Sequence, residues 1–317
     1  MAQNEYLFVE KYRPQVIDDC ILPSALKKTF KDIVKSGVLP NLILSGVPGC
    51  GKTTVAKALC NELGVDVMFI NGSENGGIDT LRTTIRNFAS TVTLNESGRY
   101  KVVIIDEVDG SGGNSMFQTG LRAFLEEFAS NCRFILTCNY KNRIIDPLHS
   151  RCTVIDFVIQ PKEKPKLAQE LLNRIKTILV TENITYEEKV VAELIIRRFP
   201  DFRRILGEIQ TYSMSGKIDE GILIRQSDVN ISELLTAMKA KSFTDVRKWV
   251  AVNAQMDHAT LFRKIYDGLS EHFDKKCIPQ IILILAEYQY KISFSADAEI
   301  CLAACMVEIM MNAEFKT

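Results

Sequence analysis

Eight residues near the start of the 317-residue chain have the spacing of a phosphate-binding loop. The segment Gly46-Val47-Pro48-Gly49-Cys50-Gly51-Lys52-Thr53 fits G-x-x-x-x-G-K-[ST] and lies between an apolar run and a helical stretch. Glycines let backbone N–H groups turn toward phosphate oxygens, Lys52 adds a positive charge, and the Thr53 hydroxyl can ligate Mg²⁺. The N-terminus of the following helix, which includes Thr54, also favours anions. The segment therefore predicts a site for a nucleoside triphosphate.

Two adjacent acids, Asp106 and Glu107, are the second group of residues suited to chemistry. They follow the run Val102-Val103-Ile104-Ile105, which is typical of a strand covered on both faces. Ligands of open parallel sheets bind at the C-terminal ends of the strands. There Asp106 can hold Mg²⁺ through water while Glu107 polarises the attacking water. An acidic strand end is common by itself, but after a phosphate loop it predicts hydrolysis and not binding alone.

Polar residues also end a later apolar run, Cys132 to Asn139. Thr137 or Asn139 is expected to hydrogen-bond the γ-phosphate or the attacking water. Farther along, Arg151 has no evident acidic partner close in sequence. A guanidinium in that situation suits the charge that develops during phosphoryl transfer, although a surface salt bridge is the alternative.

Alternating strands and helices must position these residues. Five apolar runs separated by helical stretches predict a doubly wound parallel sheet. The runs cover residues 41–44, 65–71, 100–107, 132–139 and 153–157. Ser24 is expected to cap a helix that ends at Gly37, and Asp79 or Thr80 to cap the helix after the second run.

The helix predicted from about Ser115 to Phe128 has an apolar stripe. Gln118 and Arg122 are one turn apart beside this stripe, and a solvated flank is as good an interpretation as a functional one. Prolines 161 and 165 then mark a linker, after which strand signals nearly vanish. We therefore predict three domains: an α/β nucleotide-binding domain (1–160), a small helical domain (161–228) and a helical bundle (229–317). The apolar helix faces of the bundle suit packing against other subunits.

Composition restricts the classes of function. The 39 basic and 39 acidic residues give no net charge, so bulk electrostatics does not predict a protein that coats nucleic acid or a membrane. Nine cysteines without a C-x-x-C pair indicate reduced thiols in a cytosolic compartment. Because we find no apolar run long enough to cross a membrane and no secretory signal pattern, we expect a soluble protein of the cytoplasm, with no membrane partner.

The motifs KYRP, GVPGCGKT, VVIIDEVD, LTCN, SRC and PDFRRIL occur in this order over most of the chain. Together they resemble the ATPase subunits of sliding-clamp loaders in the AAA+ superfamily, especially the large-subunit family of T4-like bacteriophages. The resemblance implies an AAA+ P-loop parallel-sheet domain, a helical lid and a C-terminal all-helical collar. One departure is Val108, where many clamp loaders have alanine, and it should leave the chemistry intact. For a phage-encoded chain, the cytoplasm would be that of the host.

Further roles follow only from this resemblance. Lys52 and Thr53 would bind the phosphates and Mg²⁺. Asp106 would bind Mg²⁺, and Glu107 would activate the attacking water. Asn139 looks like the first phosphate sensor and Arg203 like the second. Arg151 is similar to an arginine finger that reaches the ATP of a neighbouring subunit, and Arg122 to a second arginine acting in trans. Tyr12, Arg13 and Ile21 are similar to the segment next to adenine.

The implied activity is ATP-driven opening of a sliding clamp and its placement on primer-template DNA. The implied partners are the clamp, the DNA and the other subunits of a pentamer, in which four copies of the chain assemble with one distinct subunit. Arg82 and Arg86, one turn apart on one helix face, are the candidate DNA contacts, with an ordinary solvated face as the alternative.

Three other functions are alternatives to this one. A helicase loader or branch-migration motor shares the core motifs, but the combination of KYRP and SRC disfavours it. A second alternative is a structural subunit that binds ATP without hydrolysing it. Such subunits commonly lack one of the groups that correspond to Glu107, Asn139 and Arg151, and this chain has all three. A small-molecule kinase would need a substrate pocket and lid arginines in one α/β domain, and the helical C-terminal half has no such pattern.

Overall fold

The chain divides into two compact units, Met1–Leu223 and Ile224–Thr317. The computed structural model describes residues 7–72, 78–91, 100–110, 115–214, 216–218, 231–253, 258–295 and 297–316. The division into three domains with a last boundary after residue 228 remains a prediction.

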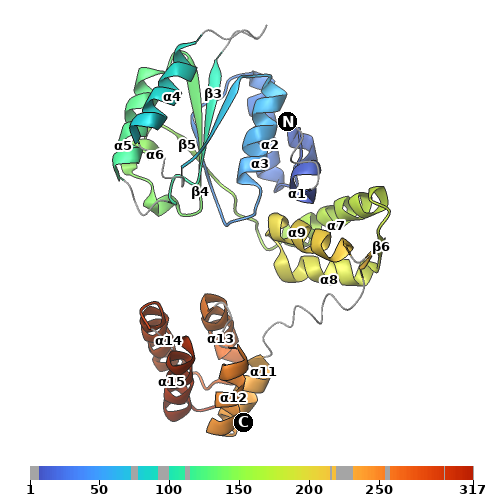
Figure 1. Ribbon diagram of the computed structural model, residues 1–317, viewed down its shortest axis with the longest axis vertical. Helices are drawn as coiled ribbons and strands as arrows, with labels where there is room; N and C mark the ends of the chain where they lie inside the picture. The colour runs from blue at the N-terminus through green and yellow to red at the C-terminus, as the bar shows by residue number, and fades with distance from the viewer. Residues whose placement is uncertain are drawn as a thin grey trace. The chain divides into compact units, whose positions relative to one another are not determined.

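A five-stranded parallel sheet lies at the centre of the first unit (Figure 1). Its strands are β1 (Leu42–Ser45), β2 (Val67–Asn71), β3 (Lys101–Asp106), β4 (Cys132–Cys138) and β5 (Thr153–Asp156). They lie in the order β2-β3-β4-β1-β5, and every neighbouring pair is parallel. The predicted α/β fold is confirmed, and each of the five apolar runs coincides with one strand, although β1 extends one residue beyond its run. Because the strands are parallel, their C-terminal ends meet at one edge of the sheet.

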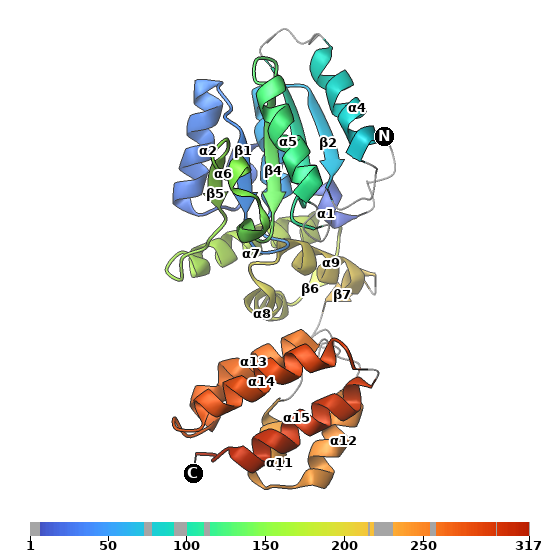
Figure 2. The same cartoon turned by 90° about the vertical axis from the view of Figure 1, so that its left-hand side faces the viewer.

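Helices cover both faces of this sheet (Figures 1 and 2). They are α2 (Ser24–Ser36) and α3 (Lys52–Leu63) on one face, and α4 (Ile78–Ser90), α5 (Ser115–Glu127) and α6 (Asp146–His149) on the other. Side chains alternate along β1: Leu42 and Leu44 pack in the core that includes Phe30, whereas Ile43 packs in the core that includes Phe124. This alternation with apolar residues on both faces is typical of a parallel strand between two helical layers.

Two of the predicted helix caps are wrong. Helix α2 begins at Ser24 itself, and Pro23 occupies the N-cap position without a side-chain hydrogen bond. Helix α4 begins at Ile78, so Asp79 and Thr80 are inside its first turn. A cap residue needs a non-helical backbone, and the sequence pattern placed these boundaries one to three residues late. The end of α2 at Gly37 is confirmed, and its φ of 64° is in the left-handed region that glycine favours.

The small helical part of the first unit follows β5. It consists of α7 (Lys164–Thr181), α8 (Glu188–Arg198), α9 (Phe202–Ser213) and two short parallel strands, β6 (Thr185–Tyr186) and β7 (Lys217–Ile218). Its apolar core also contains Phe8 of the N-terminal helix α1 (Phe8–Lys11), whose backbone N–H donates to Gln210 Oε1 at 2.9 Å. The N-terminal segment therefore packs against helices that come more than 150 residues later.

The named elements in the described part of the second unit are all helices, as predicted, and one isolated antiparallel bridge joins Phe273 to Phe315. Its helices are α11 (Ile231–Lys239), α12 (Phe243–Asn253), α13 (His258–His272), α14 (Ile278–Ile292) and α15 (Ala298–Asn312). They share one core, in which Trp249 and Ile284 are buried together with Cys301 and Cys305. Across both units, each described helix is too short or too polar for a membrane-spanning segment.

Candidate nucleotide-binding and hydrolysis site

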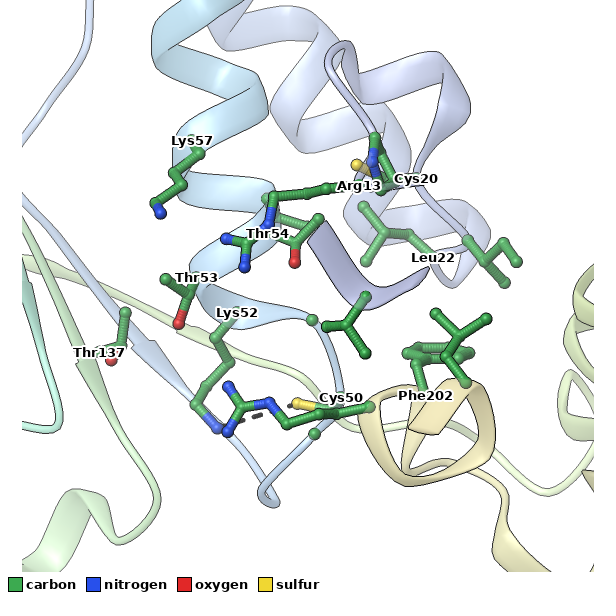
Figure 3. A pocket seen from close by; sticks show the side chains of 18 of the residues that line it. Arg13, Cys20, Leu22, Cys50, Lys52, Thr53, Thr54, Lys57, Thr137 and Phe202 are labelled. Atoms are coloured by element: carbon green, nitrogen blue, oxygen red, sulfur yellow. Dashed lines mark hydrogen bonds between the residues drawn. The ribbon is translucent and has the colours of Figure 1, made fainter. Parts of the chain in front are cut away.

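A cavity of about 350 Å³ lies where the segments after β1, β3 and β4 meet (Figure 3). The N-terminal segment and helix α9 complete its walls. The predicted site residues that line it are Tyr12, Arg13, Ile21, Pro48, Gly49, Cys50, Gly51, Lys52, Thr53, Thr54, Asp106, Glu107, Asn139 and Arg203. Gly46 and Val47 belong to the loop but do not line the cavity, and Arg122, Arg151 and Arg86 lie outside its lining. The fold thus brings most of the predicted nucleotide site together and leaves the predicted trans-acting arginines elsewhere.

Lys52 lies at the centre of the phosphate loop. Its Nζ donates to the carbonyls of Gly46 at 2.8 Å and Val47 at 2.9 Å, and to Asn139 Oδ1 at 2.9 Å. These bonds use all three hydrogens of the ammonium group. Gly51, the N-cap of α3, has φ 94°, a backbone conformation that side chains with a Cβ rarely adopt. The positive charge is therefore held at the start of α3, where phosphate oxygens can replace its present acceptors.

Thr137 hydrogen-bonds the acid pair at the end of β3. Thr53 Oγ1 donates to Asp106 Oδ1 at 2.7 Å, and Thr137 Oγ1 donates to the same oxygen. Thr137 also accepts from the backbone N–H of Glu107 at 3.0 Å and is fully buried. Glu107 has φ 56°, which is uncommon for a residue other than glycine and is typical of functional sites. Of the two polar candidates at the end of β4, Thr137 hydrogen-bonds both acids, and Asn139, which follows the strand, contacts Lys52 through its side chain.

Arg13 contributes unsatisfied donors to the opposite wall. Its guanidinium is paired with Glu10, yet Nε and Nη1 are buried without a hydrogen-bond partner among the described residues. Figure 3 shows Arg13 on the side of the cavity formed by Cys20 and Leu22, away from Thr137. Because buried donors without partners are costly, these two groups suit a bound polar ligand.

Helix α9 is attached directly to the phosphate loop. Phe202 N–H donates to the Gly49 carbonyl at 3.0 Å, and Asp201 caps α9 by accepting from Arg204 N–H at 2.9 Å. Gly49 has φ 73°, and a Cβ at this position would lie 1.9 Å from Asp201 Oδ1. These contacts place the exposed Arg203 at the cavity wall. Sequence reasoning missed Asp201, although an aspartate just before a helical run is an ordinary cap signal.

Two buried polar residues connect the acid pair to the segment after β4. Asp109, only 2% exposed, accepts from the N–H groups of Asn139 at 2.9 Å and Tyr140 at 2.7 Å through Oδ2. Gln118, also 2% exposed, donates to the Arg143 carbonyl at 3.0 Å and accepts from Ile145 N–H at 2.8 Å. The interpretation of Gln118 as a solvated flank is therefore wrong. The role of Asp109 was missed because its partners are 30 and 31 residues away.

Arg151 has an acidic partner that its sequence neighbourhood does not reveal. Its Nε donates to Glu126 Oε1 of α5 at 2.8 Å. Arg122, which is exposed, has its Nε 3.8 Å from the same carboxylate oxygen. The surface salt bridge that was the alternative for Arg151 is thus present within its own chain.

The two candidate DNA contacts are on α4. The Arg86 guanidinium is exposed and lies 3.4 Å from Glu127 Oε1. Arg82 is also in α4, but its side chain lies outside the described residues.

The sheet order, the phosphate loop and the acid pair define an AAA+ ATPase, and the comparisons agree. Residues 42–159 match the ATPase family associated with various cellular activities (AAA). Residues 163–224 match the AAA+ ATPase lid domain of the sliding-clamp-loader large subunit. The chain is 37% identical to the sliding-clamp-loader large subunit of Enterobacteria phage T4, over 99% of this chain and 98% of that protein. It is 41% identical to the same subunit of Escherichia phage RB69, over 90% and 88% of the two chains.

The chain belongs to the sliding-clamp-loader large-subunit family of AAA+ ATPases. Its fold is also similar to that of the RuvB Holliday-junction branch-migration motor of Thermotoga maritima, with a TM-score of 0.54 and 20% identity over 81% of this chain and 78% of that one. At this identity the likeness concerns the fold alone. The match to the clamp-loader lid therefore favours the clamp-loader prediction over the branch-migration motor.

Proposed function

We propose that this chain uses ATP binding and hydrolysis to open a ring-shaped sliding clamp and to load it on primer-template DNA during replication. The observation that carries the proposal is the similarity to clamp-loader large subunits along nearly the whole chain, lid included. Glu107 lies in the cavity wall with Asp106 and Asn139, so the chain has the groups for hydrolysis as well as for binding. This supports an active ATPase over a structural subunit that only holds the nucleotide.

In the proposed site, Lys52, Arg203 and the loop N–H groups bind the phosphates, and Arg13, Tyr12 and Ile21 surround the base. Glu107 accepts a proton from the attacking water or orients that water. Asn139, which already accepts a hydrogen bond from Lys52, senses the γ-phosphate.

Thr53 and Asp106 are the residues that would hold Mg²⁺. Their oxygens are 2.7 Å apart in the cavity wall, and hydroxyl and carboxylate oxygens are the ligand types that this ion prefers. When bound, Mg²⁺ neutralises charge that develops on the phosphates.

We further propose that Arg151 and Arg122 act on the nucleotide of a neighbouring subunit, because neither lines the cavity of its own chain. The proposed assembly contains four copies of this chain and one distinct subunit. The C-terminal unit, residues 229–317 in the predicted division, would form the collar. Large apolar side chains are exposed on several of its helices, including Leu283, Tyr290, Ile300 and Met311, which suits burial against other subunits.

The loader function is tested by measuring ATP hydrolysis of the assembled complex with the clamp, with primer-template DNA and with both. We expect the greatest stimulation when both are present, and we expect the clamp to remain topologically linked to circular DNA after hydrolysis. A complex built from Lys52→Ala chains is the control for nucleotide dependence. Stimulation by four-way junctions and not by primer-template DNA would instead support the branch-migration alternative.

Replacing Arg82 and Arg86 together by alanine tests the proposed DNA contacts on α4. Basal hydrolysis and assembly should be retained, whereas stimulation by primer-template DNA should fall because cationic contacts to the backbone are lost. The salt slope of DNA binding should decrease by about one unit for each phosphate contact removed. The loss should be similar for unrelated DNA sequences.

A matched control is the double alanine variant of Arg197 and Arg263, two arginines of other helices that each pair with an acid. DNA-stimulated hydrolysis across a salt series is the measurement. Wild-type stimulation and slope in the Arg82 and Arg86 variant would place the DNA on another surface.

A further inference from the structure

One carboxylate oxygen is shared by the two arginines that are proposed to act in trans. Glu126 Oε1 accepts from Arg151 Nε at 2.8 Å and from Arg151 Nη2, and Arg122 Nε is 3.8 Å away. Glu126 and Arg122 are one turn apart on α5, and Arg151 follows α6. The side chains are 51% (Glu126), 48% (Arg122) and 31% (Arg151) exposed. The cluster is therefore at the surface, where another subunit can reach it.

The hydrogen bonds of Arg151 leave it little capacity to bind phosphate. A guanidinium has five N–H donors. Nε and one Nη2 hydrogen are used by Glu126, and Nη1 donates to the Pro147 carbonyl at 2.9 Å and to Ser150 Oγ at 3.1 Å. One Nη2 hydrogen has no partner among the described residues. One of the edges with which arginine can bind phosphate bidentately, formed by Nε and Nη2, is occupied by the carboxylate.

The pairing with Glu126 also opposes the electrostatic action of a finger. A neighbouring negative charge offsets the field of the guanidinium at the place where phosphoryl charge develops. The Arg151 guanidinium lowers the pKa of Glu126, so the carboxylate is ionised near neutral pH. Exposed ion pairs change an equilibrium by about fivefold at most, so the multiple charges of a triphosphate can displace this one.

We propose that Glu126 is a positioning residue that holds Arg151 and Arg122 on their own subunit until the phosphates of the neighbouring nucleotide take them over. The inference rests on the proposed trans role of Arg151. Glu126 then favours the disengaged arrangement when subunits are poorly aligned, and it has little effect once DNA has aligned them. It therefore lowers hydrolysis in the absence of DNA and makes the rate more dependent on DNA.

The variant Glu126→Gln in the assembled loader tests this competition. The amide keeps the size of the side chain but loses the charge that holds the guanidinium. We expect kcat without DNA to rise, by up to about fivefold, since that is the range of an exposed ion pair. The DNA-saturated kcat and the KM for ATP should stay at the wild-type values. Glu126→Asp, which keeps the charge, should have a smaller effect than Glu126→Gln.

Glu193→Gln is the matched control, because Glu193 forms a comparable exposed pair with Arg197 on α8. It should leave all three kinetic values unchanged. Two results would overturn the proposal: wild-type kinetics in Glu126→Gln, or a fall in its DNA-saturated kcat, which would mean that Glu126 supports the finger. Either result counts only if the variant is soluble, assembles with the other subunits and unfolds at the same temperature as the wild type.

The double variant Glu126→Gln with Arg151→Ala separates this inference from the function on which it rests. If Glu126 acts through Arg151, the double variant should be as inactive as Arg151→Ala. If the rise without DNA persists in the double variant, Glu126 does not act through Arg151 and the proposed restraint of Arg151 is wrong. If Arg151→Ala alone hydrolyses ATP at the wild-type rate, the trans role of Arg151 fails instead.

Discussion

Glu107→Gln is expected to reduce ATP turnover of the assembled loader by about 10²- to 10⁴-fold, the range for removal of a general base. Glutamine has the same shape, but its amide cannot accept the proton of the attacking water. The backbone of residue 107 is held by its hydrogen bond to Thr137 Oγ1 at 3.0 Å, so the substitution should not move neighbouring groups. Binding of ATP and Mg²⁺ should be retained, because Lys52, Thr53 and Asp106 are unchanged.

The measurement combines equilibrium binding of a fluorescent ATP analogue with steady-state hydrolysis in the presence of clamp and DNA. Asp106→Asn is the informative comparison, because it should weaken the Mg²⁺-dependent part of binding, whereas Glu107→Gln should not. Unchanged steady-state hydrolysis by Glu107→Gln would show that another group activates the water. Loss of ATP binding by this variant would assign Glu107 to the binding of nucleotide or metal.

Most of the nucleotide site is predictable because it depends on local patterns and one rule of topology. The phosphate loop and the acids at the end of β3 are recognisable from neighbouring residues, and parallel strands bring their ends to one edge. That rule is sufficient to join Lys52 to Asn139, which are 87 residues apart, and Thr53 to Asp106, which are 53 apart. No side-chain packing has to be known for these contacts.

The contacts that sequence reasoning missed depend on packing between elements. Gln118 is beside the apolar stripe of α5, and only the course of the chain after β4 buries it against the backbone of Arg143 and Ile145. The pairing of Arg151 with Glu126 likewise needs the end of α6 to lie beside α5. Periodicity assigns residues to a face of a helix, but it does not say which segment covers that face. The missed residues are therefore those that connect site elements to one another.

Arg151→Ala should abolish most hydrolysis in the assembled loader, by about 10³-fold or more if the residue acts as an arginine finger. ATP binding to the isolated chain should be unaffected, because Arg151 is not in the lining of the cavity. The alternative is that Arg151 only forms its salt bridge with Glu126, in which case truncation removes one partly exposed ion pair and has a small effect. These outcomes differ by orders of magnitude, so steady-state hydrolysis with clamp and DNA distinguishes them.

Mixing Arg151→Ala chains with Lys52→Ala chains determines whether the arginine acts within its own chain or across an interface. Lys52→Ala removes the charge at the centre of the phosphate loop but leaves Arg151 intact. In a mixed assembly, some interfaces place an intact Arg151 from the Lys52→Ala chain against an intact phosphate loop of the Arg151→Ala chain. If Arg151 acts in trans, these interfaces hydrolyse ATP, and the mixture is more active than either variant alone. Under conditions in which subunit exchange is verified with labelled chains, a mixture with no more activity than its components would contradict the trans role of Arg151.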